Sequence, residues 1–393
     1  MNSILPKLKN GFKNNEMIKE SILKLIDKLS LNNHLLKDEY LMIFDNITFE
    51  ETTYLYQKAY EAKIPYYQNR VFLRALIEIS NYCKMGCKYC GINSSSNSIK
   101  RYRLSVDEIL ECCRLGFSLG YKTFVLQGGE DSFYTDDVLI EIISKIKLEN
   151  PNTRVTLSIG ERSKESYQKL YTAGADRYLL RHETASKRLY NYLHPNYMSF
   201  ENRRECLENL KEIGFQVGAG FMVGTPTQTN DDLVEDLLYL KKLNPHMIGI
   251  GPYLCHEDTE LRGNISGTLD QTLVMVALTR LTLPKVLLPA TTALGTVDMT
   301  GREKGLKAGA NVIMPNISPS ENKKLYEIYQ NKICTVDSSD LDKDNLESKV
   351  NSVGHVIDLG VGDYVDIERM VESEIENIYI KYYKQGKILQ WMR

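Results

Sequence analysis

Residues 73–90 read LRALIEISNYCKMGCKYC, a β-rich run followed almost at once by three cysteines. The run Leu73–Ile79 predicts a strand, and the loop after it spaces Cys83, Cys87 and Cys90 as C-x3-C-x2-C. Eight cysteines in 393 residues are too few for a disulfide scaffold, and the other five are scattered. The cluster of three therefore indicates a metal site in a reducing compartment.

The alternation of strand and helix continues along the chain. Several amphipathic segments end at a glycine that leads into the next β-rich run, and glycine suits the left-handed C-cap that such an ending requires. Eight β-rich runs are found: Leu73–Ile79, Thr123–Leu126, Arg154–Ile159, Arg177–Leu180, Gln216–Val223, Met247–Ile250, Leu287–Ala290 and Asn311–Met314. Eight strand–helix units are the number in a (β/α)8 TIM barrel, and an open doubly wound sheet is the alternative.

This pattern divides the chain into three parts. Residues 1–65 are predicted to be an N-terminal helical extension, 66–334 the barrel, and 335–393 a C-terminal extension with a helix near 366–384. A net charge of -2 excludes a strongly basic nucleic-acid binder. No apolar run reaches 18 residues, and residues 1–15 lack the apolar core of a secretory signal. We therefore expect a cytoplasmic protein with no membrane or nucleic-acid partner.

Three thiolates in one loop favour an iron–sulfur cluster. A 4Fe-4S cube has four irons, so three protein ligands leave one iron open to a small molecule. Zinc sites usually add a second ligand pair, which this sequence lacks. A zinc site or a chance spacing is therefore a weaker interpretation of the three cysteines than an iron–sulfur cluster. The other chemistry-bearing side chains favour structural roles. Cys112, Cys113 and Cys206 are expected to be buried thiols in helices, and His256 a hydrogen-bonded side chain.

The loop, with Tyr89 before its last cysteine, resembles the signature of the radical S-adenosylmethionine (SAM) superfamily. That resemblance implies that SAM binds the open iron and is cleaved reductively to methionine and a 5′-deoxyadenosyl radical. Four further blocks resemble the HydE family of iron-only hydrogenase maturases, whose fold is a complete (β/α)8 barrel. They are RYLLRHETA at 177–185, GPY at 251–253, LPATTA at 288–293 and GANVIMPN at 309–316.

The resemblance assigns roles residue by residue. The cluster ligands are Cys83, Cys87 and Cys90. The SAM-binding positions are Tyr89, Gln127, Gly128, Gly129, Thr156, Glu183, Arg203, Met314 and Tyr326. The substrate end of the cavity comprises Arg181, Met247, Thr291, Thr292 and Tyr329. Some family members carry a second cluster near the end of the barrel, but here only Cys334 lies in that region, so we expect one cluster.

The HydE resemblance also implies a substrate and partners. The substrate would be an iron complex carrying cysteine, CO and cyanide, supplied by HydG, with the product passing towards HydF and an electron arriving from an external donor. Two alternatives stay open. One is a methylornithine synthase-like lysine mutase, which we disfavour because the proposed substrate residues include no carboxylate for the lysine ammonium. The other is a non-catalytic iron–sulfur electron carrier.

Overall fold

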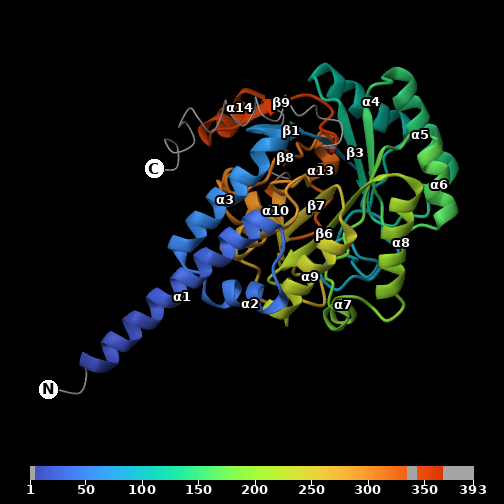
Figure 1. Ribbon diagram of the computed structural model, residues 1–393. Helices are drawn as coiled ribbons and strands as arrows, with labels where there is room; N and C mark the ends of the chain where they lie inside the picture. The colour runs from blue at the N-terminus through green and yellow to red at the C-terminus, as the bar shows by residue number, and fades with distance from the viewer. Residues whose placement is uncertain (1–4, 334–342, 366–393) are drawn as a thin grey trace.

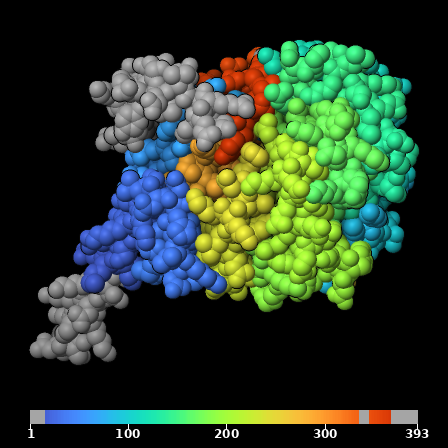
Figure 2. Space-filling model, turned by 45° about the vertical axis from the view of Figure 1, so that its right-hand side comes forward, coloured from blue at the N-terminus to red at the C-terminus, as the bar shows by residue number. Residues whose placement is uncertain are grey.

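The computed structural model describes residues 5–333 and 343–365. Its first three helices are α1 (Leu5–Asn32), α2 (Lys37–Asn46) and α3 (Phe49–Tyr67), in the region predicted to be helical. A capping box between Thr48 and Glu51 begins α3. Figure 1 shows α1 projecting from the body, and Figure 2 shows the blue N-terminal helices beside yellow and orange residues from later in the chain. The extension therefore packs along the side of the main unit, where α2 contacts α9 (Asn230–Leu243) and α3 contacts α10 (Leu269–Thr282).

The main unit is a parallel sheet covered by helices. Six strands pair in chain order: β2 (Ala75–Ser80), β3 (Thr123–Gly128), β4 (Arg154–Ser158), β5 (Arg177–Leu179), β6 (Gln216–Val223) and β7 (Met247–Pro252). The connecting helices are α4 (Val106–Ser118), α5 (Asp136–Glu149), α6 (Lys164–Thr172), α7 (Lys187–Leu193), α8 (Phe200–Ile213) and α9 (Asn230–Leu243). Figure 1 shows α4, α5, α6 and α8 on the outside of the sheet. The predicted α/β class with a parallel sheet is confirmed. Because the strands are parallel, their carboxyl ends and the loops that follow them lie at the same edge of the sheet.

Two of the predicted strands differ in the structure. The run Leu73–Ile79 is divided into β1 (Arg70–Leu73) and β2, with the buried Arg74 between them. The run Leu287–Ala290 forms isolated bridges, Met247 to Leu287 and Pro289 to Val312. Pro289 has no backbone N–H to donate to a ladder, which explains why pairing there is interrupted. A further bridge joins Leu76 of β2 to Asn316.

The rest of the described chain lies after β7. It comprises α10 (Leu269–Thr282), α11 (Thr292–Val297), α12 (Gly301–Lys307), β8 (Val312–Ile313), α13 (Ser320–Lys323), α14 (Lys343–Ser352) and β9 (Val356–Asp358). β9 was not predicted, and it pairs in parallel with β1, which also pairs with β8. The helix predicted near 366–384 lies outside the described residues. No helix in the described ranges is long and apolar enough to cross a membrane.

The segment after β9 closes the amino-terminal end of the sheet. Asp363 accepts hydrogen bonds from Arg177 at 2.6 Å, Arg154 at 2.8 Å and Gln216 at 2.7 Å. Arg177 is only 3% exposed, so Asp363 compensates a buried cation. Although burial alone would raise the pKa of Asp363, hydrogen bonds and charge from the two arginines hold it well below its usual range.

We expect Asp363→Asn to destabilise the fold by about 1–3 kcal/mol, the scale for a buried donor that loses its charged partner. Because the folded-state pKa of Asp363 is depressed, its contribution is present above the ordinary carboxyl pKa and is lost as the pH falls below it. Urea unfolding at neutral pH and at acid pH measures both effects. A variant as stable as the original at neutral pH would show that this ion pair contributes nothing.

Candidate active site

The carboxyl ends of the parallel strands surround a cavity of about 330 Å³. Most of the side chains predicted to bind the cluster, SAM or substrate line it together. They are Cys87, Tyr89, Cys90, Gln127, Gly128, Glu183, Arg203, Met314 and Tyr326, with Arg181, Thr291, Thr292 and Tyr329 from the predicted substrate end. Residues separated by more than 200 positions in the sequence therefore share one space.

The cysteine loop forms one wall of this cavity. Cys83 is not among the lining residues, but its Sγ accepts backbone hydrogen bonds from Met85 and Glu130, each at 3.4 Å. Gly129 also lies behind the lining, against the start of the loop, where a Cβ would come within 2.3 Å of the Tyr82 carbonyl oxygen. Glycine is required there because any side chain would force the loop away from the strand end.

Charged groups face the thiols across the cavity. Glu183 is buried, and its Oε2 has no hydrogen-bond partner but lies 3.3 Å from Arg181 Nη2. Arg203 lies on α8, where its Nε donates to Glu161 at 2.5 Å and its Nη1 to the Arg181 carbonyl at 2.9 Å. Burial opposes the charge on Arg203, but Glu161, acting together with Tyr190, Tyr89 and Glu130, raises the pKa overall, so the guanidinium stays charged.

Aromatic side chains complete the walls. Tyr89 and His194 share a hydrogen bond of 3.2 Å, and their rings meet edge to face. On the other side, the Tyr326 hydroxyl accepts from Gln127 Nε2 at 3.4 Å. Both tyrosine rings are thereby fixed in place beside the cavity.

Besides Cys83 and Gly129, two further predicted residues are not among those that line this cavity. Thr156 and Met247 instead line a separate space of about 10 Å³ with Arg74 and Arg177, towards the amino-terminal end of the strands. Arg74 donates to Met247 Sδ at 2.6 Å, and Thr156 Oγ1 is buried without a hydrogen-bond partner. The structure thus gives these two side chains no contact with the thiol-lined space.

With this geometry established, comparisons with known proteins identify the family. The model of the radical SAM superfamily matches residues 77–240. The chain is 48% identical over 318 residues to the [FeFe] hydrogenase maturase subunit HydE of Thermotoga maritima, covering 81% of this chain and 89% of that protein. The chain is a radical SAM enzyme of the HydE family.

More distant relatives share the fold. A 3-methylornithine synthase of Methanosarcina acetivorans is 30% identical over 310 residues, 78% of this chain and 87% of that protein. The crystal structure of methylornithine synthase (PylB) aligns with a TM-score of 0.72 at 24% identity, over 90% of this chain and 99% of that one. A structure of the maturase HydG also aligns with a TM-score of 0.72, at 19% identity, over 97% of this chain and 85% of that one.

Radical SAM enzymes use a 4Fe-4S cluster and SAM, and the residues of the site fit both groups. Burial raises the pKa of Cys90 to about 12 and also raises the pKa of Cys83 and Cys87. Deprotonation of these thiols therefore requires a nearby positive charge of the kind that iron ions supply. The unbonded Oε2 of Glu183 and the buried, unpartnered Nε of Arg181 offer a polar ligand an acceptor and a donor.

The thiols do not form a site for a single metal ion. No group of three or more His, Cys, Asp or Glu side chains within residues 5–333 and 343–365 is arranged to hold one ion. In a cube each thiolate binds a different iron, so the three sulfurs need not converge on one point.

Sequence reasoning missed a buried ion pair in the cavity wall. Glu78 of β2 is fully buried and pairs with Lys332, which is 3% exposed; Asn316 Nδ2 also donates to Glu78 at 2.8 Å. Lys332 further donates to the Tyr326 carbonyl at 3.1 Å. The cavity wall therefore holds a carboxylate beyond the predicted substrate residues, although the charge of Glu78 is already compensated. A signal was present in the sequence, since Glu78 is an acidic residue inside a buried β-rich run.

The four residues that were expected to have structural roles are all buried. Cys112, Cys113 and Cys206 are buried in helices. His256 is buried and accepts from the Asp258 N–H through Nδ1 at 3.1 Å, whereas its Nε2 has no partner.

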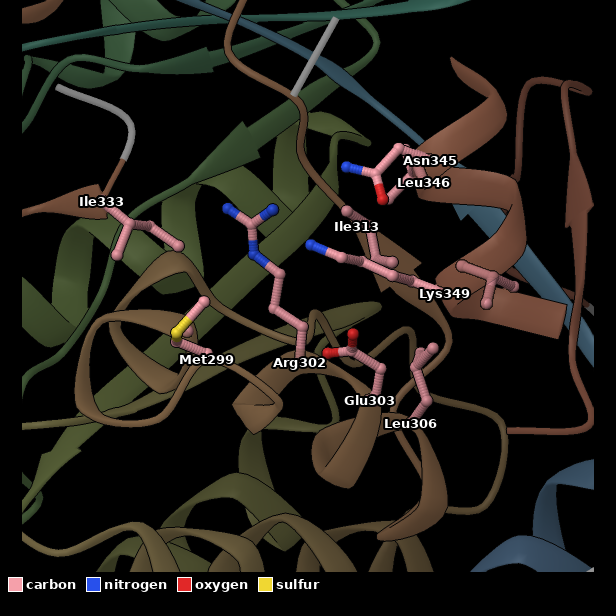
Figure 3. A pocket seen from close by; sticks show the side chains of 11 residues that line it. Met299, Arg302, Glu303, Leu306, Ile313, Ile333, Asn345, Leu346 and Lys349 are labelled. Atoms are coloured by element: carbon pink, nitrogen blue, oxygen red, sulfur yellow. The ribbon is translucent and has the colours of Figure 1, made fainter. Parts of the chain in front are cut away.

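Cys334 lies outside the described residues. The preceding Ile333 lines a separate cavity of about 100 Å³, which shares no lining residue with the thiol cavity. Figure 3 shows Arg302 of α12 and Lys349 of α14 extending into this second cavity from different walls. Ile333 thus lines a space distinct from the thiol cavity, whereas Lys332, one residue earlier, lines the thiol cavity itself.

Proposed function

We propose that this HydE-family enzyme holds one 4Fe-4S cluster on Cys83, Cys87 and Cys90, cleaves SAM reductively, and acts on a cysteine-bearing iron complex during assembly of the [FeFe]-hydrogenase active site. The observation that carries the proposal is the single cavity in which Cys87 and Cys90 share walls with Arg181, Thr291 and Thr292. The bound cluster and SAM supply the radical chemistry. The protein itself binds, orients and shields the reactants.

The cavity offers distinct groups for the cofactor and the substrate. The backbone at Gln127–Gly129 lies against the cysteine loop and suits the amino group of SAM, and the Glu183 carboxylate suits its ribose hydroxyls. The positive charge of Arg203 is retained next to Glu161 and suits the SAM carboxylate. Arg181, Thr291 and Thr292 add a cation and two hydroxyls, which suit an anionic or carboxylate-bearing substrate.

We propose in addition that the fold is a closed (β/α)8 barrel covering 66–334, flanked by extensions at 1–65 and 335–393. The isolated bridges support closure, because Met247–Leu287, Pro289–Val312 and Leu76–Asn316 connect β7 back to β2 through residues 287–316. β9 and Asp363 attach the C-terminal extension to the amino-terminal end of this ring.

We infer partners from the relationship to HydE. HydG would deliver the iron complex, HydF would receive the product, and an external donor would reduce the cluster. The relative in Thermotoga maritima is a maturase of this pathway, which supports the assignment. Pull-down of HydF or HydG by the reconstituted protein tests these contacts directly.

The lysine mutase is the runner-up because a 30% identical relative is a 3-methylornithine synthase. Glu78 supplies a carboxylate at the cavity wall, but Lys332 and Asn316 already occupy both of its oxygens. A substrate ammonium would have to displace Lys332 from a buried ion pair, which is costly. The cavity therefore favours an anionic substrate over lysine.

Arg181 provides the test of the substrate end. We expect Arg181→Ala to weaken binding of thiazolidine carboxylates or cysteine-like compounds by roughly 1.5–3 kcal/mol, the scale of a charge-assisted hydrogen bond. The cluster's electron paramagnetic resonance (EPR) signal should be unchanged. Isothermal titration of the reconstituted protein measures the affinity, and unchanged binding in the variant would remove Arg181 from the substrate site.

A further inference from the structure

Glu183 has a backbone conformation that non-glycine residues rarely adopt. Its φ is 65°, in the left-handed region. Such a conformation persists only where the surroundings impose it, and it occurs preferentially at functional sites. Here the Glu183 N–H donates to the Gly220 carbonyl at 3.0 Å, and the Glu183 carbonyl accepts from the Met222 N–H at 3.2 Å. The backbone of Glu183 is thus attached to β6 on both sides of its Cα.

A buried carboxylate on the neighbouring helix holds the residues on either side of Glu183. Asp236 of α9 is fully buried, and its Oδ1 accepts from the Ala185 N–H at 2.5 Å. The same oxygen lies 3.1 Å from Nε2 of His182. One carboxylate oxygen therefore bonds to a residue before Glu183 and to a residue after it.

The hydrogen bonds define the tautomer of His182. Its Nδ1 accepts from the Gly220 N–H at 3.3 Å, so the ring proton is on Nε2 and points to Asp236. Burial, aided by the charge of Arg181, lowers the pKa of His182 well below its usual range, so the ring is neutral. Gly220 thereby contacts both the His182 ring and the Glu183 backbone.

We infer that Asp236 and His182 form a positioning pair that aims the Glu183 carboxylate into the cavity and thereby sets the affinity for SAM. Neither residue lines the cavity, so both act through Glu183. The inference rests on the role proposed above for Glu183.

A purely structural role explains Asp236 less well. Its second oxygen, Oδ2, is buried without a hydrogen-bond partner, and burial raises the pKa of the carboxyl well above its usual range. A well-packed apolar side chain would avoid this cost. Oδ1 accepts both hydrogen bonds whether or not Oδ2 carries a proton, so an asparagine at this position would retain the positioning.

The test measures SAM binding to the reconstituted protein by its effect on the EPR signal of the reduced cluster. Asp236→Ala should raise the Kd for SAM about tenfold, by analogy with the 10–100-fold losses found when a residue that orients a metal-ligating side chain is removed. Asp236→Asn should stay within about threefold of the original, because it keeps the accepting oxygen. Asp363→Ala is the matched control: it removes a carboxylate at the opposite end of the strands and should lower stability without changing the Kd.

A double-mutant cycle with Glu183→Ala completes the test. If Asp236 acts through Glu183, adding Asp236→Ala to Glu183→Ala should raise the Kd no further. Fully additive effects, or an Asp236→Ala variant that loses thermal stability while retaining the original Kd, would overturn the positioning role. If Glu183→Ala alone binds SAM normally, the cofactor role proposed for Glu183 fails instead, and the two failures are distinguishable.

Discussion

Replacing Cys83, Cys87 or Cys90 by alanine is expected to abolish the 4Fe-4S cluster and, with it, all reductive cleavage of SAM. Each thiolate binds a different iron, so no remaining ligand substitutes for the one removed. Anaerobic reconstitution of the unaltered chain should give about four irons per chain, and each variant should give far fewer. Iron analysis and the EPR spectrum after dithionite reduction measure the loss.

Other cysteines of this chain provide the controls. Cys112→Ala and Cys206→Ala remove buried helical thiols outside the cavity and should leave the iron content unchanged. Cys334→Ala should also retain the cluster. About eight irons per chain, or loss of iron in the Cys334 variant, would contradict the assignment of one cluster to the three-cysteine loop.

Lys332→Met is expected to have the second large effect, a destabilisation of about 3–5 kcal/mol, because it leaves the buried Glu78 without its cation. The segment that carries Tyr326 should also loosen, since Lys332 donates to the Tyr326 carbonyl. Anaerobic urea unfolding measures the stability. SAM titration measures the consequence for the cavity that Tyr326 lines.

The double variant Glu78→Gln/Lys332→Met separates charge from packing. Removing both charges should restore much of the lost stability, because no uncompensated carboxylate remains in the interior. If the single Lys332→Met variant is as stable as the original, the ion pair is not a determinant of this wall. If the double variant is less stable than the single one, packing rather than charge dominates.

Local signals in the sequence were sufficient to predict the class of fold and the class of cofactor. The C-x3-C-x2-C spacing predicts a cluster loop from adjacent residues alone, and the strand–helix alternation predicted the parallel α/β class that the structure shows. The four blocks between 177 and 316 then pointed to residues that the fold brings into one cavity. Such features are readable because each depends on residues close together in the chain.

Features that depend on distant pairing were not predictable. Glu78 and Lys332 are 254 positions apart, and nothing local to either indicates that they meet. The pairing of β9 with β1 and the contact of Asp363 with Arg177 likewise join opposite parts of the chain. Met247 is the first residue of β7, so it lies at the end of the strand that is distant from the cavity. A residue-by-residue resemblance does not specify how far along a strand from the cavity a side chain lies.

The most direct test of the central proposal follows the fate of SAM with each candidate substrate. The reconstituted protein, reduced with dithionite, is incubated with SAM and either lysine or the cysteine-bearing iron complex made by HydG, and 5′-deoxyadenosine and the products are quantified by mass spectrometry. We predict that the iron complex is consumed with formation of 5′-deoxyadenosine and methionine, and that lysine is returned unchanged. Conversion of lysine to methylornithine, with the iron complex untouched, would contradict the proposed function.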